Sequence, residues 1–185
     1  MDAIKAIGLY IEYIMKWGID RNITLKGGAS MSSQFQKGAQ EVIELAIAYG
    51  KYQSVTHDTA QASEELLDGV GDYITCIVQA WRLGGGSAAS FSKMLVDTID
   101  AREEACHYAG INPGHKSLEL MAQACVRGSV TIALVHAVDF VVFMTGTNLF
   151  CKATSQDFIA KALQQAWYEI KDRKGTMING QFVKE

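Results

Sequence analysis

Proline is nearly absent from this chain, which has Pro113 as its one proline among 185 residues. Proline interrupts helices because it lacks a backbone donor, so its scarcity leaves room for long uninterrupted helices. Alanine, leucine, isoleucine and glutamine are frequent instead, which favours helices over a sheet built of many turns. With 49% hydrophobic and 20% charged residues, the chain can bury a core and is not expected to be disordered. We therefore expect an all-α helical bundle in a single domain, residues 1–185.

An excess of positive charge is also lacking, since the chain has 17 lysines and arginines against 20 aspartates and glutamates. The formal net charge of −3 gives no overall electrostatic reason for binding a polyanion. We expect no nucleic-acid partner, because proteins that bind nucleic acid through its phosphates usually carry a basic face.

Closely spaced cysteines are missing too, and no CxxC motif and no secretory leader are found. The four cysteines are widely separated: Cys76, Cys106, Cys125 and Cys151. This pattern is typical of reduced, mostly buried thiols in a cytoplasmic protein, so disulfides are not expected.

One long apolar run, SVTIALVHAVDFVVFMTGTNLF at 129–150, is nearly long enough to cross a bilayer. His136 and Asp139 lie in its middle, and no basic cluster flanks it. Charged groups at that depth are costly in lipid, so the run predicts a buried helix of the bundle and no membrane partner.

Acidic residues recur at helical spacing inside otherwise apolar segments. Two sets are found: the pair Glu41 and Glu44, and the triplet Glu65, Asp68 and Asp72. Each set lies on one face of its helix, so a hairpin of the two helices would bring both sets of carboxylates to the shared interface. Carboxylates in a partly dry site repel one another unless they are protonated, paired with bases or neutralised by a cation, and hard divalent ions favour such all-oxygen sites. The pattern predicts a metal site, whereas the simpler interpretation is a solvated acidic face.

Four segments of the sequence together resemble a known protein family. They are WGIDRNI at 17–23, QFQKGAQEVIEL at 34–45, ELLDGVGDYITCIVQAWRLG at 65–84 and AWYEIKDRKGTMINGQFVKE at 166–185. In their order they resemble the MazG-like all-α nucleoside triphosphate pyrophosphohydrolases, especially the phage-encoded members. Two positions depart from that family's pattern: Gln40 stands beside Glu41 where a second acid is usual, and Gly69 lies three residues before Asp72.

The resemblance implies hydrolysis of a nucleoside triphosphate, with a deoxynucleotide favoured, to the monophosphate and pyrophosphate with Mg²⁺ or Mn²⁺ as cofactor. The catalytic residues it implies are Glu41, Glu44 and Asp72. The metal ligands are taken from Glu41, Glu44, Glu65, Asp68 and Asp72, and spacing alone leaves open whether Glu65 or Asp68 completes the set. The substrate-binding residues it implies are Gln34, Lys37, Lys171, Arg173, Lys174, Trp17 and Arg21.

Simpler roles are available to these substrate-binding candidates. Lys37 can pair with Glu41 at i,i+4, and Trp17 at a helix end can be a packing residue. The basic tail can complement the C-terminal dipole of a helix predicted over 156–174. Two other functions therefore stay open: a non-catalytic helical interaction protein with a degenerate metal site, and an enzyme of the dimeric dUTP-hydrolysing type.

Residues 90–150 form an additional helical segment whose sequence pattern resembles that of the acidic hairpin. Asp139 precedes an apolar run as Asp72 does, and Glu104 lies near the place of Glu44, which suggests a degenerate repeat. The alternative is a core His–Asp pair formed by His136 and Asp139. Because a two-helix hairpin cannot enclose a nucleotide alone, we also expect a homo-oligomer, a dimer or higher.

Local signals predict the remaining boundaries. A first amphipathic helix is expected over 3–18, with Ser32 or Ser33 as the N-cap of the next helix and Asp58 or Thr59 as the N-cap of the third. Further helices are expected over 90–108 and 129–150. Asn179-Gly180 is a strong turn signal, which predicts a short C-terminal β-hairpin.

Overall fold

The computed structural model describes residues 1–54, 58–109, 114–146, 154–178 and 181–185, and it is an all-α bundle as predicted. The helices are α1 (Ala3–Asp20), α2 (Met31–Gln53), α3 (Thr59–Leu83), α4 (Ala88–Ala109), α5 (Gly114–Arg127), α6 (Val130–Gly146) and α7 (Ser155–Ile170). Two short strands, β1 (Gly175–Ile178) and β2 (Gln181–Lys184), follow α7. The predicted bounds of α1 and α4 and the predicted start of α6 agree with the structure to within a few residues, whereas α5 was not predicted and the last helix ends earlier than predicted.

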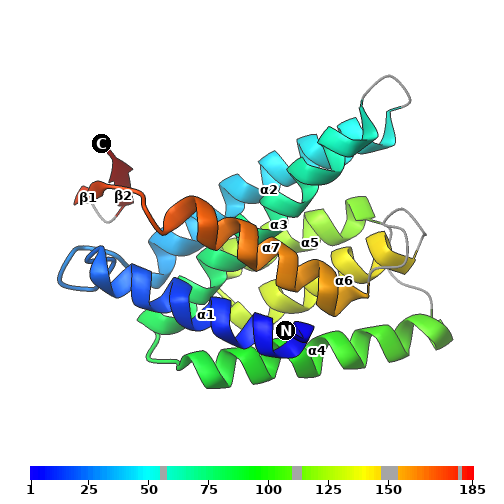
Figure 1. Cartoon of the computed structure of the whole chain (residues 1–185), viewed down its shortest axis with the longest axis horizontal. Helices are drawn as coiled ribbons and strands as arrows, with labels where there is room; N and C mark the ends of the chain where they lie inside the picture. The colour runs from blue at the N-terminus through cyan, green and yellow to red at the C-terminus, as the bar shows by residue number, and fades with distance from the viewer. Residues whose placement is uncertain (55–57, 110–113, 147–153, 179–180) are drawn as a thin grey trace.

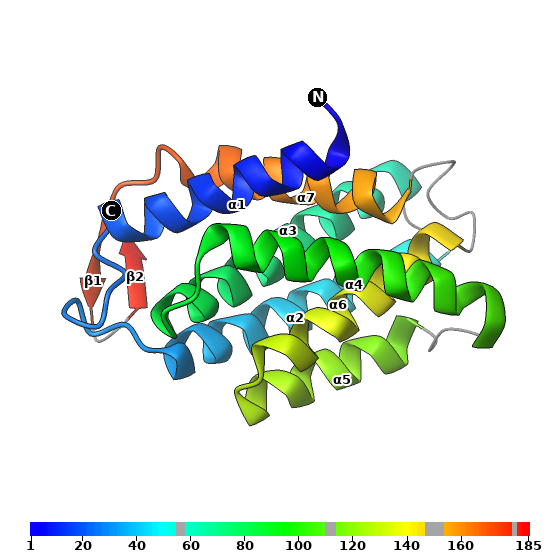
Figure 2. The ribbon, with the colours of Figure 1, turned by 90° about the horizontal axis from the view of Figure 1, so that it is seen from below.

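Helix α3 lies at the centre of the bundle, where α1, α2, α6 and α7 all contact it (Figures 1 and 2). It pairs most extensively with α2, which runs antiparallel to it as the predicted hairpin. Its apolar residues are buried on more than one side, since Leu66, Tyr73, Ile74 and Ile77 are all fully inaccessible to solvent. A helix in this position can present side chains to several neighbours at once.

Two serines begin α2, but not in the predicted way. The N-cap is Ser30, so the prediction of Ser32 or Ser33 was wrong. The side chain of Ser30 accepts a hydrogen bond from the Ser33 backbone at 3.0 Å, and that of Ser33 accepts one from the Ser30 backbone at 3.0 Å. This reciprocal capping box needs a hydrogen-bonding side chain at both positions, and only the pair together defines the start. Of the alternatives for α3, Asp58 is the cap, accepting from the Ala60 backbone at 2.8 Å.

The long apolar run forms α6, whose side chains pack against α3, α4, α5 and α7. The end predicted for this helix, residues 147–150, lies outside the described residues. No helix in the described part of the chain is long and apolar enough to cross a membrane. Cys76 and Cys125 are free, buried thiols, as predicted, whereas the side chains of Cys106 and Cys151 lie outside what the structure describes.

The last helix ends at Ile170, four residues earlier than predicted, and a turn leads from it into the strands. The Arg173 backbone N–H bonds to the Ile170 carbonyl at 2.9 Å, and the Arg173 carbonyl accepts from Arg21 Nε at 2.9 Å. This contact with the end of α1 holds the chain out of the helical path. The predicted hairpin is confirmed: β1 and β2 pair antiparallel, with Ile178 opposite Gln181, while the turn Asn179-Gly180 itself is outside the described residues.

Candidate functional site

A cavity of about 530 Å³ lies between α1, α2, α3, the end of α7 and the C-terminal hairpin. This size is typical of a small-molecule site. Its walls contain residues predicted from separate parts of the sequence: Trp17, Gln34, Lys37, Glu41, Glu44, Asp72 and Arg173. The fold therefore brings the two acidic helices and part of the basic tail around one space.

Glu41 is buried in the cavity wall, with 4% of its surface exposed. Lys37, one turn earlier on α2, places its Nζ 2.5 Å from Glu41 Oε1. Partial burial lowers the pKa of Lys37, but the hydrogen bond and negative charge of Glu41 outweigh it, so the pKa is raised and the ammonium stays charged. The side chain of Lys37 is about half exposed, at 49%, and lines the cavity, so pairing with Glu41 still leaves it open to an anion.

Asp72 on α3 faces the same cavity and is surrounded by negative charge. Burial raises its pKa to about 7, with further contributions from the charges of Glu41, Asp68 and Glu169, while Arg173 opposes them. A carboxyl group with this pKa is only partly ionised at neutral pH unless a cation is added nearby. The site is therefore short of positive charge.

Three carboxylates converge where α3 meets α7. Asp68, Asp72 and Glu169 each offer an oxygen, and these oxygens lie within 4.8 Å of one another. Opposite ligand oxygens in an octahedral Mg²⁺ site are separated by about 4.2 Å, so the spacing suits this ion. Burial, and then the hydrogen bond and charge of Glu169, raise the pKa of Asp68 to about 6. The oxygen-only donor set, its spacing and its excess of negative charge fit a divalent cation.

Glu169 was missed by the sequence analysis, although its segment was singled out for its basic residues. It lies on α7 and forms an ion pair with Arg173 at 2.9 Å, one turn later. That spacing to a basic residue is the one sequence signal that could have found it, and the same signal is common on any solvated helix.

The two candidates for the last acidic position occupy different surroundings. Asp68 lies beside Asp72 and accepts a hydrogen bond from Gln165 Nε2 of α7 at 3.3 Å. Glu65, nearer the start of α3, forms an ion pair with Lys51 of α2 at 2.7 Å and accepts from Gln61 Nε2 at 3.1 Å. These contacts favour Asp68 as the ligand, and Glu65 as a residue that ties α2 to α3.

Substitution of these two acids should separate their roles. We expect Asp68→Asn to weaken Mg²⁺ binding by about tenfold or more, because it removes a charge from the cation site without changing bulk. Glu65→Gln should leave Mg²⁺ binding unchanged and lower stability slightly through loss of its partly exposed ion pair. Isothermal titration of metal-free protein with Mg²⁺, together with thermal unfolding, checks both. Equal losses of affinity in the two variants would contradict the assignment.

The basic tail divides into residues inside and outside the cavity. Arg173 lines it, and Arg21 supports Arg173 through the hydrogen bond to its carbonyl. Lys171 instead lies over the Tyr168 ring, 4.5 Å from its centroid, and near Asp172 at 3.8 Å. Lys174 is exposed beyond the turn. Of the three predicted tail cations, only Arg173 is therefore brought into the cavity wall.

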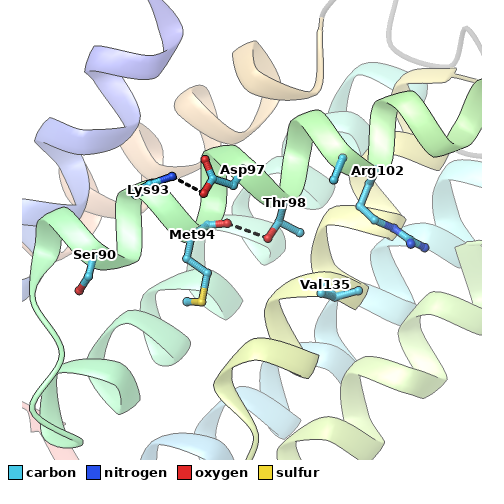
Figure 3. A pocket seen from close by; sticks show the side chains of 8 residues that line it. Ser90, Lys93, Met94, Asp97, Thr98, Arg102 and Val135 are labelled. Carbon is cyan, nitrogen blue, oxygen red and sulfur yellow. Dashed lines mark hydrogen bonds and ion pairs between the residues drawn. The ribbon is translucent and has the colours of Figure 1, made fainter.

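A second hollow, of about 490 Å³, lies between α4 and α6 (Figure 3). Lys93 and Asp97 on its rim are paired at 2.6 Å, and the Thr98 hydroxyl donates to the Met94 carbonyl at 2.7 Å. None of the predicted site residues lines this hollow, so it is not the candidate functional cavity.

Asp139, the acid whose sequence context resembles that of Asp72, lies in a different environment. Asp139 is 1% exposed, forms an ion pair with Arg102 at 2.5 Å, and has the Nδ1 atom of His136 at 3.4 Å from its carboxylate. Its charge is thus balanced by side chains, as in the alternative of a core pair, with Arg102 as an additional partner. Glu104 is exposed on α4. The degenerate repeat stays a prediction, but this second acid is not part of a comparable acidic cluster in the described residues.

No protein-family model matches the chain, and neither a curated protein nor a solved structure matches it.

Proposed function

We propose that the protein hydrolyses a nucleoside triphosphate to the monophosphate and pyrophosphate in a Mg²⁺-dependent reaction. The observation that carries the proposal is one cavity whose wall combines buried or partly buried carboxylates, Glu41 and Asp72, with two cations, Lys37 and Arg173. A triphosphate needs both kinds of group, because carboxylates hold the metal that bridges its oxygens and cations bind the remaining charge.

Asp68, Asp72 and Glu169 are the residues that would hold the divalent ion, with Glu41 close enough to Asp72 to influence its pKa. An ion bound there supplies charge neutralisation for the phosphates and lowers the pKa of water. Oxygen ligands suit Mg²⁺ or Mn²⁺, and the nearby Cys76 thiol is not needed. Burial and the charges of Glu41 and Asp72 raise the pKa of that thiol well above its ordinary value, so it stays neutral.

The chain's own residues then position the substrate and the water. Lys37 and Arg173 bind phosphate oxygens and offset charge on the departing pyrophosphate. In this proposal Glu41, which is buried and paired with Lys37, orients a water molecule and accepts its proton. Glu44, which is exposed on the cavity wall, assists entry of the ion or water.

The proposal is tested with a panel of ribo- and deoxynucleoside triphosphates, with pyrophosphate release as the readout. We expect turnover of at least one of them with Mg²⁺ or Mn²⁺ and none with EDTA, because the carboxylate cluster is electrostatically incomplete without the cation. Activity restored by adding excess Mg²⁺ after EDTA is the control for irreversible damage. Absence of turnover on every nucleotide in the presence of metal would contradict the proposal.

Absence of turnover would favour the alternative of a non-catalytic helical interaction protein. One structural observation supports that alternative. Ile43 and Ile47 lie one turn apart on α2 and are 64% and 56% exposed. A partner that covered this pair would bury apolar surface that is now exposed to water. The same pair supports the homo-oligomer expected from the sequence, which remains a proposal beside the enzymatic one.

A further inference from the structure

The cavity changes character along α3. Asp72 lies at its charged end, and Thr75 and Gln79 follow on the same face, one and two turns later. Gln79 follows Asp72 by a step of seven helical residues, a distance of about 10 Å along the axis. Since α2 is antiparallel, its neutral residues Ser33 and Gln34 lie toward the Gln79 end, and its acids lie toward Asp72. A ligand that fills the cavity thus meets charge at one end and neutral groups at the other.

The neutral end is fixed by the side chain of Gln79, which is 1% exposed. Its Nε2 donates to the Ile14 carbonyl of α1 at 2.7 Å, and its Oε1 accepts from Arg82 Nε at 2.7 Å. A Cβ atom at Gly18 would lie 2.2 Å from that Oε1, so a side chain at position 18 would displace the Gln79 amide from these hydrogen bonds. Trp17, the neighbour of Gly18, is thereby held against the cavity.

Two polar atoms on this wall are buried and have no hydrogen-bond partner among the described residues. They are the indole Nε1 of Trp17, whose residue is 8% exposed, and the hydroxyl Oγ1 of Thr75. Buried polar groups in folded proteins are normally hydrogen-bonded, and an unpaired one is costly. Both residues line the cavity, so a rotation of either side chain would present its polar group to a ligand there.

We propose that Trp17 and Thr75 bind the nucleobase of the substrate, with the indole N–H donating to an acceptor atom of the base and the Thr75 hydroxyl pairing with a second polar atom. The inference rests on the proposed function, and it assigns the neutral end of the cavity to the base and the charged end to the triphosphate.

Chemistry separates these two ends. Neither an indole N–H nor a hydroxyl carries charge, whereas Lys37 and Arg173 do, so phosphates are bound better near the two cations. Apolar surface is also present beside Trp17: Phe182 of β2 packs against its ring with centroids 5.3 Å apart, and Ile23 completes this part of the wall. A flat heteroaromatic ring with polar edges suits walls that are apolar apart from a few hydrogen-bonding groups.

The test compares Thr75→Val, which keeps the side-chain shape and removes the hydroxyl, with Ser117→Ala as a matched control. Ser117 on α5 is fully buried, its hydroxyl also has no partner among the described residues, and it does not line the cavity. Both variants remove an unpaired buried hydroxyl, so neither should lower the melting temperature of the ligand-free protein. Only Thr75→Val should lower kcat/KM for the best nucleoside triphosphate, by about tenfold.

Three further arms make the outcome decisive. The inhibition constant of inorganic triphosphate should be the same for wild type and Thr75→Val, because that ligand has no base. Trp17→Phe, which keeps a ring and removes the N–H, should weaken nucleoside triphosphates more than inorganic triphosphate. A substrate without the 3′-hydroxyl should show the same Thr75→Val penalty, since the contact is to the base.

A Thr75→Val variant with wild-type kcat/KM overturns the inference while leaving the proposed function in place. Loss of the penalty with the 3′-deoxy substrate overturns it as well and assigns Thr75 to the sugar. Equal weakening of inorganic triphosphate would mean that Thr75 acts on the phosphate end. If wild-type protein turns over no nucleotide, the proposed function itself fails, and that result is seen before any variant is made.

Discussion

Replacing Asp72 by asparagine should abolish turnover and at the same time stabilise the metal-free protein above pH 7. The loss of activity is expected to be about a thousandfold, because the substitution removes a charge from the group of carboxylates that would hold the metal. Asparagine has nearly the same shape, so the helix pair should be preserved. A substitution that lowers activity but raises stability identifies a residue of the functional site, because loss of a structural residue would lower both.

The stability effect follows from the raised pKa of this carboxyl group. Its pKa is about 7 in the folded protein against 3.8 for the ordinary value, so between these two pH values the folded state holds a proton that the unfolded state has released. Stability contributed by this group is therefore present at low pH and is lost as the pH rises from about 4 to 7. Asparagine is neutral throughout and avoids that loss. Allowing for partial solvation of the group, we expect a gain of about 2 kcal/mol at pH 8.

Urea unfolding of both proteins at pH 5 and pH 8, in buffer with EDTA, measures this effect. The difference between the variant and wild type should be less than half as large at pH 5 as at pH 8, because part of the loss already occurs between about pH 4 and pH 5. Added Mg²⁺ should stabilise wild type at pH 8 and the variant much less, because only a ligand of the folded state shifts the transition. Asp97→Asn is the matched control: Asp97 is exposed and pairs with Lys93, so its substitution should change neither property. A destabilised Asp72→Asn protein would contradict the electrostatic account.

Replacing Gly71 by alanine should disrupt the site by separating two helices. A Cβ atom at Gly71 of α3 would lie 2.3 Å from the Ala162 carbonyl oxygen of α7 and 3.1 Å from the Ala166 Cβ. The first contact is with backbone, so it can be relieved only if α7 moves. Such overpacking costs about 2 kcal/mol or more, which lowers Tm by about 5 °C or more in a domain of this size.

The movement should also impair activity, because α7 brings Glu169 to Asp68 and Asp72. We expect at least about a tenfold fall in kcat/KM and in Mg²⁺ affinity. Gly50→Ala in α2 is the control, since nothing lies within 4 Å of a Cβ atom there and alanine is the better helix former. It should be neutral or slightly stabilising. Wild-type affinity in a folded Gly71→Ala protein would mean that the α3–α7 contact does not position the metal ligands.

Hydrophobic periodicity predicted most of the helices, because each amphipathic helix must bury one face whatever its neighbours are. The ends were less well predicted. Ser30 caps α2 through a reciprocal contact with Ser33, which no single residue reveals, and α7 ends at Ile170 because the following turn is held by Arg21 from the other end of the chain. Helix propensity depends only on residues close in sequence, so it cannot predict a contact between the two ends of the chain.

By itself, the sequence determined the all-α class, the acidic hairpin of α2 and α3 and the face on which each set of acids lies, since these depend on spacing within one helix. Tertiary structure alone decided that Glu169 joins Asp68 and Asp72, that Glu65 pairs with Lys51 instead, and that Lys171 and Lys174 stay outside the cavity. Gln165 reaches Asp68 across a separation of 97 residues. This contact exists because glycine at position 71 lets α7 pack directly on α3, and such a close approach depends on the shapes of both helices together.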